Sequence, residues 1–223
     1  MNNEKKISAS IMCADLLHLQ DDIDVLEKCG VDYLHLDVMD GAFVPNITLG
    51  IDLCNDVGEY SRVKRDVHLL VENPKIFLDR LNLKRDEMVS VHYEADVNIP
   101  LLSKLTRAKG AKFGVALNPE TPIEVLEPIL DQLDFVLLMM IKPGFAGLKK
   151  EAGMVEKIAD LRAFLRERGK EDMPIEADGN VSFKNAKLMS QASANVFVAG
   201  SSSVFSGADT IENCFLRLKK AVG

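Results

Sequence analysis

The sequence lacks closely spaced cysteines. Its four cysteines lie far apart and form no Cys-x-x-Cys pair, which argues against a zinc ribbon or a redox pair. We expect them to be reduced, as is typical of a cytoplasmic protein. They are Cys13, Cys29, Cys54 and Cys214.

The sequence also lacks a long apolar run. No segment approaches the roughly 20 consecutive apolar residues that a membrane-spanning helix needs. The first six residues, MNNEKK, lead directly into a short expected strand, with no apolar signal segment after them. We therefore expect a soluble protein that does not contact a membrane.

Basic residues are outnumbered by acidic ones. The chain has 27 Lys and Arg against 34 Asp and Glu, which gives a formal net charge of -7. This excess argues against a nucleic-acid partner, because the phosphate backbone attracts positive charge. The basic residues also occur in mixed runs such as Lys149-Lys150-Glu151, which indicate solvated helix faces.

Short apolar runs alternate with amphipathic helical patterns over the whole chain, which is typical of βα units around a parallel sheet. With 223 residues, 47% of them hydrophobic, the chain can bury a sizeable core. The expected strands are 6–10, 33–39, 67–71, 88–93, 112–117, 135–141, 174–178 and 195–199. The expected helices are 15–29, 51–60, 75–83, 100–109, one that opens at 119–122, 151–168, 183–191 and 210–220. Eight strands in strict alternation with eight helices, with no linker, predict one α/β domain over residues 1–223, a (β/α)8 TIM barrel.

Histidines and acids stand at the ends of three expected strands. His35 and Asp37 are two residues apart, so they point to the same face of their strand. His68 lies on the next strand, and Asp178 ends the seventh. One such histidine is more often a core or surface residue, but three strands with ligand-type residues at the same end favour a site.

These two imidazoles and two carboxylates fit one divalent metal ion, because buried charges are kept only when they are paired or bind a metal. Mixed His and Asp ligands suit zinc, iron, manganese or cobalt.

Three glycine-bearing turns follow the last three strands, at 143–147, 178–180 and 200–202. Glycine lets backbone N–H groups approach an anion closely, and a phosphate site recurs at this place in barrels. Beside a bound phosphate, a divalent ion can polarise a carbonyl and stabilise an enediolate. Asp37 and Asp178 come from separated strands and could face opposite sides of that intermediate, a geometry that suits epimerisation.

The segment HLDVMDGAFVPN at 35–46 resembles the hallmark of the ribulose-phosphate 3-epimerase family. The later segments VHLLVENP (67–74), ALNPETP (116–122), PGFAG (143–147) and VFVAGSS (196–202) resemble its other motifs in the same order, so the resemblance covers essentially the whole chain. It implies a barrel of the ribulose-phosphate binding type that inverts C3 of a ketose phosphate. It also implies one divalent metal ion, two aspartates and no organic cofactor. The implied reaction converts D-ribulose 5-phosphate into D-xylulose 5-phosphate.

The resemblance assigns roles residue by residue. Asp37 and Asp178 are the implied acid/base pair, and the implied metal ligands are these two with His35 and His68. The residues implied to contact the substrate are Ser10, Met39, His68 and Met139. The residues implied to bind phosphate are Gly144, Phe145, Ala146, Gly147, Gly179, Asn180, Gly200 and Ser201.

The chain departs from the family pattern at four positions, none of which is an implied ligand or acid/base. They are Ala42, Leu70, Lys142 and Leu148, where the family usually has His, Met, an Asn or acid, and Gln. These departures leave the sugar open. Segments 10–17 and 145–147 look closer to the allulose 6-phosphate branch of the family, whose members act on D-allulose 6-phosphate and D-fructose 6-phosphate.

Three further points stay open or are excluded. A barrel that binds a sugar phosphate without turning it over is a third hypothesis, supported only by the altered rim. A relationship to orotidine-phosphate decarboxylases is discounted, because no lysine stands two residues after Asp37. The sequence allows a homo-oligomer but does not define one.

Overall fold

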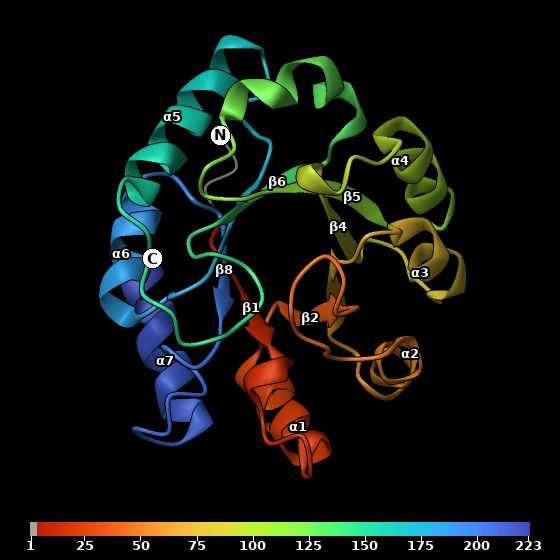
Figure 1. The fold of residues 1–223 in the computed structure, drawn as a ribbon. Coiled ribbons are helices and arrows are strands. Elements are labelled where there is room, and N and C mark those ends of the chain that lie inside the picture. Colours follow the sequence, from red (N-terminus) through yellow and green to blue (C-terminus); the bar gives the residue numbers. More distant parts are fainter. Residues whose placement is uncertain (1–3) are drawn as a thin grey trace.

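The computed structural model describes residues 4–223, so the first three residues of the expected N-terminus lie outside the described part. Within it, eight parallel strands close into a barrel in the order β1 to β8, and the helices form an outer ring (Figure 1). The predicted (β/α)8 barrel is confirmed. The strands are β1 (Lys6–Ser10), β2 (Tyr33–Met39), β3 (Lys64–Leu70), β4 (Met88–His92), β5 (Lys112–Leu117), β6 (Phe135–Met139), β7 (Ile175–Asp178) and β8 (Val196–Ala199).

The outer ring contains seven α-helices and one long 3-10 helix among the described residues. The α-helices are α1 (Leu19–Cys29), α2 (Ile51–Tyr60), α3 (Pro74–Arg80), α4 (Ile99–Ala108), α5 (Met154–Glu167), α6 (Phe183–Gln191) and α7 (Ile211–Val222). The 3-10 helices are η1 (Ile11–Cys13), η2 (Tyr93–Ala95) and η3 (Ile123–Gln132). Within residues 4–223, no helix has the length and apolar character to cross a bilayer.

Two helical predictions are corrected. The segment after β5 is the 3-10 helix η3 and not an α-helix, and it contains Pro128, which cannot donate the backbone hydrogen bond that an α-helix requires there. Helix α1 begins at Leu19 and not at Asp15, because the Asp15 carboxylate accepts the Leu17 N–H and its carbonyl accepts the His18 N–H in a separate turn.

Strand β2 shows how the barrel divides its side chains. Leu34, Leu36 and Val38 belong to the large apolar core between barrel and helices, as the alternation of a strand requires. The intervening residues His35 and Asp37 point into the barrel, where they contact residues of neighbouring strands. The outward face therefore stabilises the fold, and the inward face carries the polar groups.

Large side chains occupy the barrel interior at the amino-terminal ends of the strands. The ring of Phe135 in β6 occupies the space beside Gly114 of β5. A Cβ at Gly114 would lie 2.4 Å from this ring, so only glycine fits there. Tyr33 and Met88 belong to the same buried cluster as Phe135. Active sites of such barrels lie at the opposite end, at the carboxyl termini of the strands.

Candidate active site

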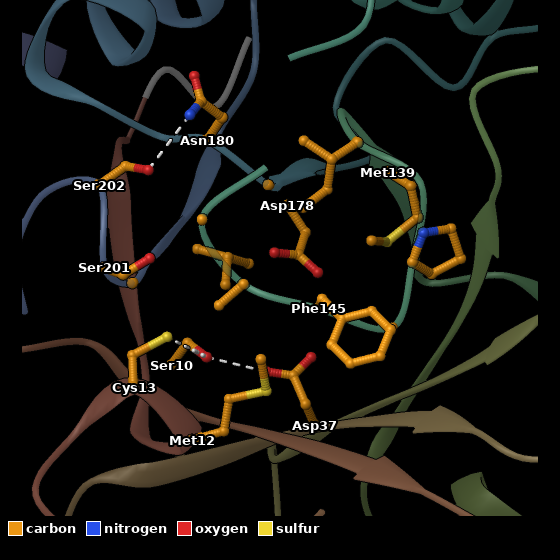
Figure 2. A pocket seen from close by; sticks show the side chains of 18 of the residues that line it. Ser10, Met12, Cys13, Asp37, Met139, Phe145, Asp178, Asn180, Ser201 and Ser202 are labelled. Carbon is orange, nitrogen blue, oxygen red and sulfur yellow. Dashed lines mark hydrogen bonds between the residues drawn. The ribbon is translucent and has the colours of Figure 1, made fainter. Parts of the chain in front are cut away.

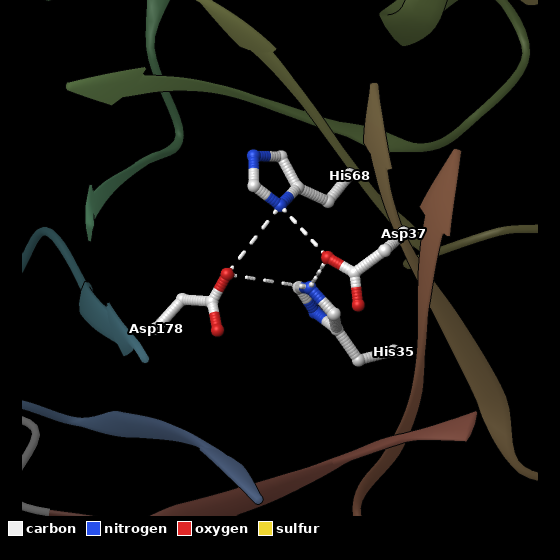
Figure 3. A group of neighbouring side chains, drawn as sticks. All are labelled: His35, Asp37, His68 and Asp178. Atoms are coloured by element: carbon white, nitrogen blue, oxygen red, sulfur yellow. Dashed lines mark hydrogen bonds and ion pairs between the residues drawn. The ribbon is translucent and has the colours of Figure 1, made fainter. Parts of the chain in front are cut away.

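Four predicted residues converge at the carboxyl ends of β2, β3 and β7 (Figure 3). The Asp37 Oδ1 atom lies 3.1 Å from Nε2 of His35 and 3.2 Å from Nδ1 of His68. The Asp178 Oδ2 atom lies 4.0 Å and 3.5 Å from the same two nitrogens. One donor atom from each residue lies within 4.8 Å of the others. The sequence therefore predicted a real cluster.

The second nitrogen of each histidine ring has its own partner. His35 Nδ1 lies 2.7 Å from Oδ2 of Asp66, which also accepts the Ser8 hydroxyl at 2.8 Å. His68 Nε2 lies 2.9 Å from Nε2 of His92. These contacts fix the orientation of both rings and leave His35 Nε2 and His68 Nδ1 facing the two aspartates.

Beneath the cluster lies a second layer that the sequence reasoning missed. Asp66 and Glu176 are fully buried, and together with His35 they form a further group of close donor atoms. Each precedes a predicted ligand by two residues, His68 and Asp178. The alternation that paired His35 with Asp37 would have found both.

Burial and neighbouring charges set the protonation of the cluster. Burial disfavours a charged His35, but the Asp37 and Asp66 carboxylates outweigh it and raise the pKa of His35 well above its usual value. Burial also opposes ionisation of Asp37, yet His35 and His68 lower the pKa of Asp37 below its usual range. Burial and then the charge of Asp66 raise the pKa of Glu176 well above its usual value, which favours the neutral acid.

The donor set fits a divalent metal ion. Donor atoms held at about 2.0–2.2 Å from one such ion are separated by roughly 3–3.6 Å. Of the four contacts between a histidine and an aspartate, those of 3.1, 3.2 and 3.5 Å fall in this range, and the His35–Asp178 contact of 4.0 Å is longer. Three carboxylates, those of Asp37, Asp66 and Asp178, also lie around two imidazoles, so a cation would reduce the net negative charge.

A pocket of about 510 Å³, open to solvent, lies above the cluster (Figure 2). The Asp37 and Asp178 side chains line its floor, and they are 7% and 13% exposed. All but one of the other residues implied to contact substrate or phosphate also line it, namely Ser10, Met39, Met139, Gly144, Phe145, Ala146, Gly147, Gly179, Asn180, Gly200 and Ser201.

His68 is the exception. Its side chain is completely buried, and it does not line the pocket. It contacts Asp37 and Asp178, which do line the pocket, so its placement supports the predicted role as a metal ligand, and a contact with substrate stays a prediction.

Two of the predicted glycine turns need glycine for physical reasons. Gly179 follows Asp178 with φ +107°, and a Cβ there would lie 2.5 Å from the Ile141 side chain. Gly144 has φ +118°, and its carbonyl accepts the Asn46 side-chain N–H at 2.8 Å. This contact ties the 143–147 turn to the loop that carries the hallmark segment.

The four departures from the family pattern lie at different distances from the pocket. Leu70 lines it, so an apolar side chain is retained at that place. Ala42, Lys142 and Leu148 are exposed and are not among the pocket-lining residues. The Leu148 backbone still contributes, because its carbonyl accepts the Asn180 side-chain N–H at 2.9 Å.

Fold and site together define a class, the (β/α)8-barrel enzymes with a His/Asp cluster and a glycine-lined pocket at the carboxyl ends of the strands. A family model described as "Ribulose-phosphate 3 epimerase family" matches residues 6–205. The chain belongs to the ribulose-phosphate 3-epimerase family, which confirms the resemblance and the prediction of an isomerase of the epimerase type.

Curated relatives agree over almost the whole chain. A ribulose-phosphate 3-epimerase of Bacillus subtilis is 41% identical over 196 residues, which cover 88% of this chain and 90% of that protein. One of Methanocaldococcus jannaschii is 38% identical over 217 residues, covering 97% and 90%. Among solved structures, a mutant tryptophan synthase alpha-subunit of Pyrococcus furiosus has a TM-score of 0.68 at 13% identity, covering 99% of this chain and 98% of that one. That likeness shows the shared fold alone.

Proposed function

We propose that this protein is a metal-dependent ketose-phosphate 3-epimerase that interconverts D-ribulose 5-phosphate and D-xylulose 5-phosphate. Family membership and the names of the relatives support the reaction. The observation that carries the proposal is the placement of Asp37 and Asp178. Both line the pocket from separate strands, β2 and β7, and each has an oxygen within 4.0 Å of both histidines.

In this proposal His35, Asp37, His68 and Asp178 hold one divalent cation, and their mixed nitrogen and oxygen donors suit zinc, iron, manganese or cobalt. A cation bound there would supply positive charge that polarises a carbonyl group and stabilises negative charge developing on its oxygen. No organic cofactor is needed for this chemistry.

The two aspartates exchange the proton at C3. One carboxylate removes the proton from one face of the sugar carbon, and the other returns a proton to the opposite face, so the configuration inverts. The Ser10 hydroxyl donates a hydrogen bond of 2.8 Å to Oδ2 of Asp37. Since Oδ1 of Asp37 faces the histidines, this contact orients Oδ2, which would exchange the proton.

The glycine turns would hold the phosphate, and the methionines would form an apolar floor. We assign phosphate binding to the backbone of 144–147, 179–180 and 200–201, which line one side of the pocket. Met39 and Met139 line the same pocket and present polarisable, uncharged surface to the sugar.

A second candidate substrate is D-allulose 6-phosphate, a six-carbon ketose phosphate. The segments that resemble the allulose 6-phosphate branch contribute directly to the pocket, through Met12, Cys13 and the 145–147 turn. Because these residues line the pocket, they can affect which length of substrate fits.

One experiment separates these functions. Purified protein is incubated with each sugar phosphate and added divalent metal, and the products are followed by NMR. We expect epimerisation of D-ribulose 5-phosphate with the larger kcat/KM. A larger kcat/KM for D-allulose 6-phosphate would show that this six-carbon sugar, and not D-ribulose 5-phosphate, is the preferred substrate. Binding of both sugars without turnover of either would support the third hypothesis, a barrel that binds sugar phosphates without catalysis.

A further inference from the structure

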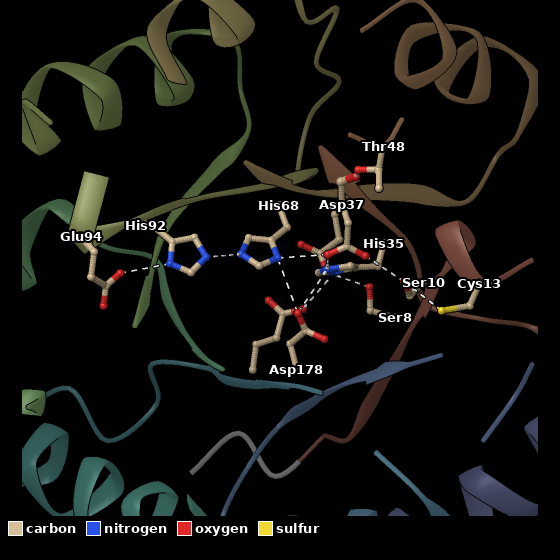
Figure 4. Close-up of polar contacts among 12 residues, drawn as sticks. Ser8, Ser10, Cys13, His35, Asp37, Thr48, His68, His92, Glu94 and Asp178 are labelled. Carbon is tan, nitrogen blue, oxygen red and sulfur yellow. Dashed lines mark hydrogen bonds and ion pairs between the residues drawn. The ribbon is translucent and has the colours of Figure 1, made fainter. Parts of the chain in front are cut away.

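A line of polar contacts leads from the His/Asp cluster into the wall of the barrel (Figure 4). His68 Nε2 lies 2.9 Å from His92 Nε2 on β4, and His92 Nδ1 lies 3.1 Å from Glu94 Oε2. The two histidine rings stack with their centroids 5.0 Å apart, and both are fully buried. His92 and Glu94 are not among the pocket-lining residues, so neither is placed to touch a substrate.

In the metal-bound form, the order of donors and acceptors along this line is fixed by its two ends, Glu94 and the cation. A carboxylate only accepts hydrogen bonds, so Glu94 requires the hydrogen of His92 on Nδ1. When a cation binds Nδ1 of His68, the hydrogen of the neutral His68 ring stands on Nε2, which lies 2.9 Å from Nε2 of His92. His92 Nε2 must then accept this hydrogen bond, which keeps the lone pair of His68 Nδ1 on the side of Asp37 and Asp178, where the cation would bind.

Glu94 is itself held by the loop after β5. Its Oε1 atom accepts the Asn118 backbone N–H at 2.8 Å and the Thr121 hydroxyl. Burial opposes ionisation of Glu94, but His92, Thr121 and Asn118 lower its pKa to about 2, so it is a carboxylate at neutral pH. Lys157 of α5 in turn donates to the carbonyls of Asn118 and Thr121, at 3.0 and 2.6 Å.

We propose that His92 and Glu94 are positioning residues that direct the Nδ1 lone pair of His68 toward the metal, and that the 118–121 segment serves to hold Glu94. This gives a role to the ALNPETP motif, to which the proposed reaction assigns none. The inference rests on the proposed metal binding and deepens it, because metal affinity then depends on residues outside the ligand set.

The competing explanation is that His92 merely fills space. Its ring also lies 4.8 Å from that of Phe43, so it packs between two aromatic rings. The two explanations differ in what may replace His92. A phenyl ring keeps the packing and loses the acceptor, whereas a glutamine side chain loses the ring but can place an amide oxygen where Nε2 stands.

The test measures Zn²⁺ affinity of the metal-free protein at neutral pH by competition with a chromophoric chelator. We expect His92→Phe to weaken zinc binding by about 10–100-fold, and His92→Gln to stay nearer the wild type. Glu94→Gln should also weaken zinc binding by at least about 10-fold. The Glu94 carboxylate accepts from His92, Asn118 and Thr121, and the NH₂ group of glutamine would face one of these donors. The double variant His92→Phe/Glu94→Gln should bind no more weakly than His92→Phe, since Glu94 acts through His92.

The matched control is Glu120→Gln, the same change at an exposed residue of the same loop. It should leave zinc affinity unchanged. Thermal unfolding of each metal-free variant confirms that the folded form is the one titrated.

Three results would overturn the inference: tighter zinc binding by His92→Phe than by His92→Gln, additive losses in the double variant, or a Glu94→Gln affinity equal to that of Glu120→Gln. If these results occur while the wild type binds zinc and turns over D-ribulose 5-phosphate, the inference fails alone. If the wild type turns over the sugar without binding any divalent metal, the metal part of the proposed function fails and the inference fails with it.

Discussion

A buried ion pair behind β3 allows a quantitative test of the barrel wall. Arg65 is completely buried, and its guanidinium donates to both carboxylate oxygens of Glu87, at 2.7 and 2.6 Å. It also donates to the carbonyls of Cys54 in α2 and Asn82 after α3, at 2.8 and 2.5 Å. Asp66 and His68 follow Arg65 on the same strand, so this pair anchors the strand that carries them.

The perturbation is Glu87→Gln, which keeps the shape of the side chain and removes its charge. Each carboxylate oxygen of Glu87 accepts two N–H groups. Three of these four groups belong to Arg65 and the fourth is the Lys84 backbone N–H, so the new NH₂ group of glutamine must face a donor. Breaking a buried pair by removing one partner costs about 3–5 kcal/mol. For a chain of this size that corresponds to a fall in Tm of about 6–20 °C.

The assay is urea and thermal unfolding of the metal-free protein at neutral pH, so that metal binding does not contribute. The control is Asp79→Asn, which breaks the Lys75–Asp79 pair, whose side chains are 48% and 50% exposed. Exposed pairs contribute about 0–1 kcal/mol, so this control should unfold almost like the wild type. A loss for Glu87→Gln no greater than that of the control would refute the reasoning.

Three further predictions concern the site. Asp37→Asn and Asp178→Asn should each lower kcat by at least about 10²–10⁴-fold with an unchanged circular dichroism spectrum, and normal steady-state rates in either would refute the roles assigned. A chelator should abolish turnover, and added zinc, manganese, iron or cobalt should restore it; turnover that survives verified metal removal would contradict the metal requirement. The Glu94 pKa of about 2 lies below the ordinary 4.5, so its ionised form stabilises the fold above about pH 4.5. Because the Glu94 carboxylate is partly exposed and screened by water, less than about 3 kcal/mol of unfolding free energy should be lost as the pH falls from about 4.5 to about 2, and urea unfolding of Glu94→Gln should show a smaller loss.

The sequence was informative where a local rule decides the structure. The two-residue spacing of His35 and Asp37 predicted their shared face, and the alternation of strands and helices predicted the barrel. Helix ends were predicted less well because they depend on the hydrogen bonds of individual turns. At Asp15 such a turn delays the start of α1 to Leu19. The prediction of an α-helix after β5 was wrong, because Pro128 interrupts an otherwise helical apolar pattern and the segment is a 3-10 helix.

The polar contacts behind the ligands could be predicted only in part. The strand period alone would have indicated Asp66 and Glu176. The His68–His92–Glu94 line depends on which strands are neighbours and on a loop distant in sequence, since Glu94 meets Asn118 24 residues away. The assignment of residues 1–223 to a single domain stays a prediction.

Deuterium incorporation at C3 tests the central claim most directly. D-Ribulose 5-phosphate is incubated in heavy water with the metal-loaded protein, and C3 of recovered substrate and product is analysed by NMR. Two aspartates that exchange the C3 proton predict deuterium at C3 of the D-xylulose 5-phosphate formed, and loss of this incorporation in Asp37→Asn and Asp178→Asn. Product that forms with its original C3 hydrogen retained, or full exchange in both variants, would contradict the account.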